Sequence, residues 1–162
     1  MSSFTDILLV SPLADGKTWV IQRPFGYDVG AEGSSDRIEV PVGFRTDFAT
    51  VPRLFWVVLP RWGRYGNATV IHDYLYWMQD RPRRESDRIL LEAMGVLAVH
   101  PVVKYAIYWG VRAFGWLAWY CNKRDRIEGL DRVDRVMPVR AVEVAPKRKG
   151  VLGHLVTQAL RR

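Results

Sequence analysis

The run from Val70 to Met78 constrains the fold more than any other part of the sequence, because apolar side chains nearly encircle it. At about 100° per residue, one apolar stripe contains Ile71, Tyr74, Leu75 and Met78. A helix that is apolar on almost every side belongs in the interior of a domain. We therefore predict a central buried helix over residues 67–79.

His72 and Asp73 are the polar exceptions on this helix. Burying a polar group without a partner costs roughly 1–3 kcal/mol, so both side chains need partners. One interpretation is structural: His72 binds a backbone carbonyl or a Tyr hydroxyl, and Asp73 binds one of Arg45, Arg53, Arg84 or Arg112. The other is functional: His72 is a general base or a metal ligand, with carboxylates beside it.

Two further carboxylates are candidates for the same site. Asp47 precedes a predicted helix start and Asp87 lies early in the next helix, where a negative charge is favourable without any function. With His72 they offer oxygen and nitrogen ligands to a divalent cation. We predict His72 and Asp73 as catalytic residues and Asp47, His72 and Asp87 as ligands of a divalent metal, supported by Arg45, Tyr76, Arg84 and Arg112. His100 and His154 lie far away, which disfavours a His-rich zinc site.

The order of elements predicts an α+β fold. Residues 6–10 and 17–22 form a predicted hairpin, residues 26–35 a loop, and the alternating run 37–42 an edge strand. Helices are predicted over residues 52–59, 67–79, 83–98 and 102–120. We expect a small antiparallel N-terminal sheet packed on a bundle of three to four helices.

The chain length suits one domain with an appendage. We predict a folded domain over residues 1–121 and a basic tail over residues 122–162 that ends in a short amphipathic helix. The tail contains eleven basic and five acidic residues, which is +6 of the net charge of +7. Because the body is then nearly neutral, nucleic-acid binding is disfavoured. The terminal helix docks on its own domain or frays in solvent, or it contacts a partner or a membrane surface.

Three sequence features bear on secretion, disulfide formation and membrane insertion. No secretory signal is recognisable at the N-terminus, and Cys121 is the single cysteine, which excludes an internal disulfide. The aromatic run Tyr105–Tyr120 has Arg112 near its middle and is shorter than the ~20 residues that span a bilayer. We predict a buried core helix there, with peripheral membrane contact through Trp residues and the basic tail as the alternative.

Two motifs carry a family resemblance. The segments GFRTDFATVP (residues 43–52) and ATVIHDYLY (residues 68–76) resemble the signature of a small phage and prophage family, domain of unknown function 1353. The resemblance covers roughly Val40 to Gly115. It implies a phage or prophage origin, a place in the host cytoplasm or the virion, and other phage proteins as partners. It brings no reaction and no ligand with it.

Two functions from different classes follow. The first is a metal-assisted hydrolase with a His/Asp site, and the second is a non-enzymatic virion, tail-assembly or lysis-accessory component that acts through protein contacts. The polar motif residues favour the first, whereas the aromatic content and the basic tail favour the second. The sequence leaves the oligomeric state open.

Overall fold

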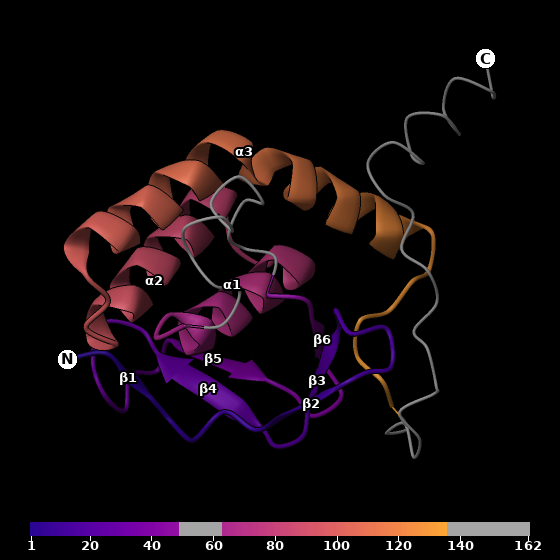
Figure 1. The fold of residues 1–162 in the computed structure, drawn as a ribbon, viewed down its shortest axis with the longest axis horizontal. Coiled ribbons are helices and arrows are strands. Elements are labelled where there is room, and N and C mark those ends of the chain that lie inside the picture. The colour runs from indigo at the N-terminus through magenta and orange to yellow at the C-terminus, as the bar shows by residue number, and fades with distance from the viewer. Residues whose placement is uncertain (49–62, 136–162) are drawn as a thin grey trace.

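Six short strands precede three helices in the computed structural model, which describes residues 1–48 and 63–135 (Figure 1). This order confirms the predicted α+β class. The predicted helix over residues 52–59, its Arg53, and the terminal amphipathic helix lie outside the described residues.

The strands form two small antiparallel sheets where one was predicted. The first sheet has the order β1 (Ser3–Phe4), β4 (Phe25–Asp28), β5 (Arg37–Val40). The second has the order β2 (Val10–Pro12), β3 (Trp19–Ile21), β6 (Arg45–Thr46). Between β3 and β4 the chain crosses from one sheet to the other through Pro24, which has no N–H to continue a ladder.

The predicted hairpin forms between β2 and β3, with Val10 opposite Ile21. Its turn is held by the Asp15 carboxylate, which accepts hydrogen bonds from the backbone N–H groups of Lys17 and Thr18. The prediction of a loop over residues 26–35 is wrong for β4. All four residues of β4 are buried: Phe25 and Tyr27 alternate with Gly26 and Asp28, and the Asp28 carboxylate is paired with Arg37 of β5.

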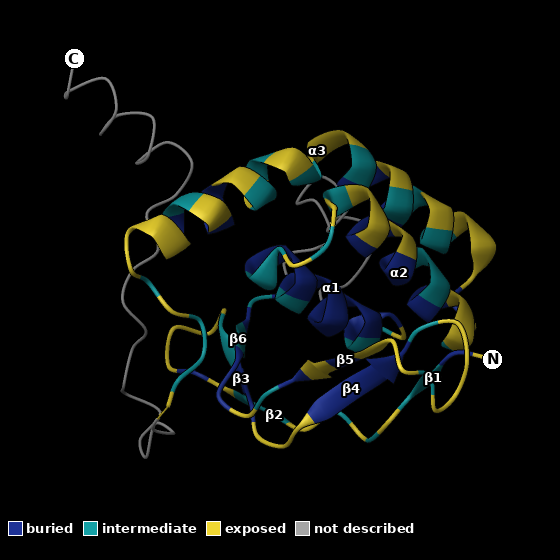
Figure 2. Cartoon of the chain, turned by 180° about the vertical axis from the view of Figure 1, so that it is seen from behind, coloured by how far each residue is buried: buried dark blue, intermediate teal, exposed yellow. Residues whose placement is uncertain are grey.

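The central helix is α1 (Gly66–Met78), and ten of its thirteen residues are buried. It contacts α2 (Arg83–Val96), α3 (Pro101–Ile127) and the strands β5 and β6. Figure 2 shows α1 in dark blue between the strands and the two outer helices. The prediction that this nearly all-apolar helix lies in the interior is confirmed.

Helix α3 continues past its predicted end at Tyr120 and through the predicted domain boundary after Cys121. Asn122 and Asp125 are buried, so the helix is held there by polar contacts that an apolar pattern does not reveal. The following residues return to β6, where Val133 bridges to Phe44. Residues 122–135 are thus part of the folded unit.

Candidate functional site

A carboxylate without any exposed surface, Asp87 of α2, lies at the centre of a polar cluster between the three helices. Its Oδ1 accepts a hydrogen bond from Tyr76 Oη at 2.6 Å and lies 3.0 Å from His72 Nε2. Its Oδ2 accepts a hydrogen bond from Arg112 Nη1 at 2.7 Å and lies 3.5 Å from Arg83 Nη1. We call these five residues the Asp87 cluster.

Helical spacing brings the cluster together. His72 and Tyr76 are four residues apart on α1, and their ring centroids lie 4.0 Å from each other. Arg83 and Asp87 have the same spacing on α2. Arg112 comes from α3, so the single carboxylate of Asp87 connects all three helices.

Gly115 of α3 leaves room for the Tyr76 hydroxyl beside Asp87. A Cβ at Gly115 would lie 2.5 Å from Tyr76 Oη, which is closer than a Cβ atom and a non-bonded oxygen come in proteins. The Trp119 ring meets the Tyr76 ring edge-on, with centroids 5.1 Å apart. Gly115 therefore allows α3 to approach the Tyr76 side chain closely.

The electrostatics of the cluster favour a charged carboxylate. Burial would raise the pKa of Asp87, but hydrogen bonds to His72, Tyr76 and Arg112 outweigh it and hold the pKa below its usual value. Burial, together with the neighbouring Asp87, raises the pKa of Tyr76 well above its ordinary value, so its hydroxyl stays a donor. A carboxylate has about four lone-pair directions, and four polar neighbours surround this one.

Asp73 has a separate environment from His72. Thr46 of β6 donates its hydroxyl proton to Asp73 Oδ2 at 2.5 Å, and Thr46 Oγ1 accepts the backbone N–H of Phe48. Adjacent helical residues diverge by about 100°, so the two motif residues face different elements. His72 faces α2, whereas Asp73 faces β6.

The structure brings only part of the predicted site together. His72, Tyr76, Asp87 and Arg112 meet, but within residues 1–48 and 63–135 no three His, Cys, Asp or Glu side chains are grouped to hold a metal ion. Half-buried Asp47 thus does not complete a three-ligand set with His72 and Asp87. The metal and acid/base roles stay predictions.

Among the predicted supporting residues, Arg45 pairs with Asp134 and Arg84 is exposed. Arg83 was not among the predicted site residues, although its i,i+4 spacing to Asp87 indicates a contact between the two side chains. Thr46 and Gly115 were not predicted either, because their roles depend on contacts between elements that are distant in the sequence.

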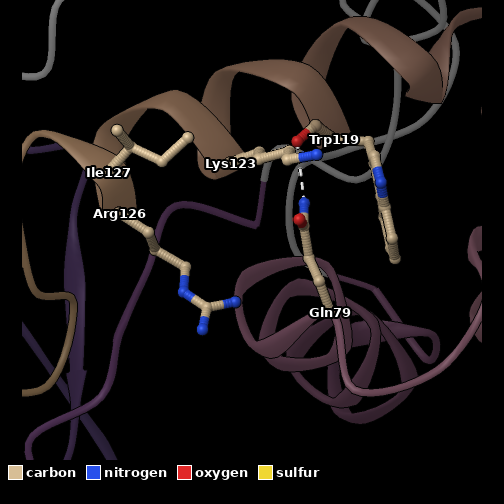
Figure 3. Close-up of a pocket in the computed structure, with 5 residues that line it drawn as sticks. All are labelled: Gln79, Trp119, Lys123, Arg126 and Ile127. Carbon is tan, nitrogen blue, oxygen red and sulfur yellow. Dashed lines mark hydrogen bonds between the residues drawn. The ribbon is translucent and has the colours of Figure 1, made fainter.

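A shallow pocket of about 580 Å³ lies where the last turns of α3 pass the end of α1, lined by Gln79, Trp119, Lys123, Arg126 and Ile127 (Figure 3). Gln79 Nε2 donates to the Trp119 carbonyl at 2.8 Å. Arg126 donates to the Trp77 and Met78 carbonyls, which an α-helix leaves unpaired at its C-terminal end. Most polar groups of this pocket therefore serve helix packing.

One side of α3 exposes large apolar residues to solvent. We call this side the α3 outer face, and its six residues are 41–72% exposed: Val102, Tyr105, Trp109, Trp116, Tyr120 and Ile127. Their spacings of three, four and seven residues place them on one side of the helix. In Figure 2, α3 is an outer helix with exposed residues along it. The prediction of a buried core helix is wrong for this side.

The described residues include no helix with both the length and the hydropathy needed to cross a membrane. This finding agrees with the short apolar run and the internal Arg112 noted in the sequence.

Over residues 19–111 the chain matches the family described as "Protein of unknown function (DUF1353)". It also resembles the uncharacterized protein y4jT of Sinorhizobium fredii (strain NBRC 101917 / NGR234), with 35% identity over 78 residues. That similarity covers 47% of this chain and 23% of the relative, so the chain matches about a quarter of the relative's length. No solved structure matches the chain. Because the family match covers more than half of the chain and includes His72, Tyr76 and Asp87, the chain belongs to the DUF1353 family.

Proposed function

We propose that this chain is a non-enzymatic binding component whose working surface is the α3 outer face. The observation that carries this proposal is the exposure of six large apolar residues along one side of a single helix. At 150–250 Å² per ring, the four exposed Trp and Tyr rings leave on the order of 400 Å² of aromatic surface in water. A patch of this size on a monomer is often functional.

The Asp87 cluster supports a structural role for the polar motif. His72 is 2% exposed and Asp87 is 0% exposed. A general base must reach a substrate proton, and a metal ligand needs a free lone pair. Four polar neighbours already occupy Asp87, so the cluster is suited to clamping α3 against α1 and α2.

One observation favours a hydrolase: His72 Nε2 lies 3.0 Å from Asp87 Oδ1. An acid/base pair requires such a contact, but so does a buried histidine in a structural network. The burial of both groups gives the structural role more support.

The biological setting of the proposal comes from the family resemblance. The segments 43–52 and 68–76 resemble phage and prophage sequences, so we place the component in a phage-infected or lysogenic host, in its cytoplasm or in the virion. Assembly or lysis are the processes in which a small binding component would act, with other phage proteins near it.

Photo-crosslinking in cells that produce the full chain tests the proposal. A photoreactive phenylalanine analogue replaces Trp116 on the α3 outer face, and a matched control replaces the exposed Glu32 in the loop after β4. We expect crosslinks to another molecule from position 116 and not from position 32. Folded protein that crosslinks from neither position would contradict the proposal. A bound divalent metal that folded His72→Ala protein loses would also contradict it.

A further inference from the structure

We infer that the α3 outer face docks on an anionic lipid surface; this inference rests on the proposed function, because it names the partner of the same face. Four of its six residues are Trp or Tyr, namely Tyr105, Trp109, Trp116 and Tyr120. These side chains combine an apolar ring with a polar tip, and they concentrate where a membrane meets water.

The charges of α3 complement an anionic surface. The helix contains five basic residues and one acid, Asp125, which is 1% exposed. Arg112 is bound to Asp87, and Arg124 pairs with Glu128 at 3.7 Å. The remaining basic residues of α3 lie near the two ends of the outer face, with Lys104 at the start and Lys123 and Arg126 at the end. Arg126 donates to backbone carbonyls of α1 and keeps its positive charge. A basic residue near an anionic membrane strengthens binding by about fivefold.

The same charges disfavour two other occupants. A second copy of α3, packed face to face, would bring basic residues together, because the one carboxylate within the helix, Asp125, is buried, and Glu128 at its C-terminal cap already pairs with Arg124. Single-stranded nucleic acid is usually held in a basic groove, whereas α3 is an outer helix with exposed residues along it (Figure 2).

The geometry suits a helix lying along the surface. At 1.5 Å per residue, α3 is about 40 Å long, so its six apolar residues can meet an interface together. The pocket of about 580 Å³ adjoins the face, because Ile127 belongs to both (Figure 3). Lys123 in this pocket is exposed and places a cation where an anionic head group would lie.

Vesicle binding of the full chain tests the inference, with phosphatidylcholine vesicles compared with vesicles that also contain phosphatidylglycerol. The face variant is Trp109→Ser with Trp116→Ser. Its matched control is Ile7→Ser with Leu9→Ser, two exposed apolar residues between β1 and β2. We expect wild type and control to bind the anionic vesicles equally, and the face variant to lose on the order of tenfold in partition.

A second variant, which removes two positive charges, measures the electrostatic contribution to vesicle binding separately from the apolar contribution. Lys104→Gln with Lys123→Gln should lower binding to anionic vesicles by roughly 25-fold and leave binding to neutral vesicles unchanged. Unchanged melting temperatures show that each variant is folded.

Equal binding to both vesicle types, or full binding by the face variant, would overturn the lipid inference. So would a dimer that sedimentation detects and the face variant abolishes. If vesicles fail to bind but position 116 crosslinks to a protein, the lipid inference fails and the proposed function stands. If vesicles fail and position 116 crosslinks to nothing, both fail.

Discussion

Replacing Gly115 with alanine tests whether the close approach of α3 to Tyr76 holds the helices together. The added Cβ would lie 2.5 Å from Tyr76 Oη, and 3.2 Å from Val111 Cγ1. Moving the hydroxyl breaks its 2.6 Å hydrogen bond to Asp87, which costs about 1.5–3 kcal/mol because the acceptor is charged. Overpacking adds about 1–3 kcal/mol, and the better helix propensity of alanine returns about 1 kcal/mol. We expect a net loss of about 3 kcal/mol.

Urea unfolding followed by circular dichroism measures this loss. The matched control is Gly95→Ala on α2, where the new Cβ would meet only Lys104 Nζ at 3.9 Å. The control should be stabilised, by up to about 1 kcal/mol. In a Tyr76→Phe background the clashing oxygen is absent, so Gly115→Ala should then cost clearly less. If Gly115→Ala stabilises the protein as the control does, or costs the same in both backgrounds, the Tyr76 contact is not what the glycine serves.

Three further outcomes follow from the structure. Asp87→Asn should lower the unfolding free energy by about 2–4 kcal/mol at neutral pH. The depressed pKa of Asp87 contributes stability above the unfolded pKa that is lost as the pH falls through the folded value, so the urea midpoints of variant and wild type should converge in acid. A chain cut after residue 121 should lose cooperative thermal unfolding, whereas one cut after residue 135 should keep it, because Asn122 and Asp125 are buried. Gly43→Ala (φ +85°) should lower the unfolding free energy by about 3 kcal/mol or more, because its Cβ would lie 2.2 Å from the Asp134 carbonyl oxygen. Gly16→Ala (φ +62°) has open space around it and should lower the same free energy by about 1–2 kcal/mol, as a thermal melt would show.

The helices were predictable because their signal is local. The apolar stripe over Val70–Met78 gave a central helix within one residue of the observed α1, and the start of α2 at Arg83 was predicted directly. The hairpin of β2 and β3 followed from its turn residues. In each case the pattern and the structure depend on neighbours along the chain.

The errors share a physical cause, which is contact between distant segments. Strand β4 alternates Phe25 and Tyr27 with Gly26 and Asp28, but it spans only four residues, and the burial of Asp28 depends on its pairing with Arg37 of β5. The last two turns of α3 are polar, and they are held by Asn122 and Arg126, which bind carbonyls of α1. Likewise, the sequence placed His72 and Asp87 among the site candidates, but only the fold shows that Arg83, Tyr76 and Arg112 surround the same carboxylate.

Helix α3 connects the polar motif residues with the exposed aromatic residues, because the two groups lie on opposite sides of it. Its inner side binds the rest of the domain through Arg112 at Asp87, Gly115 against Tyr76, and Asn122 at the end of α1. These contacts fix the helix without any of the six outer-face residues, whose exposure of 41–72% leaves much of their surface in water. Rings that the fold does not bury are unfavourable for solubility unless another surface covers them. The Asp87 cluster therefore fixes the position of α3, and the proposed docking of the outer face would cover the aromatic surface that the fold leaves in water.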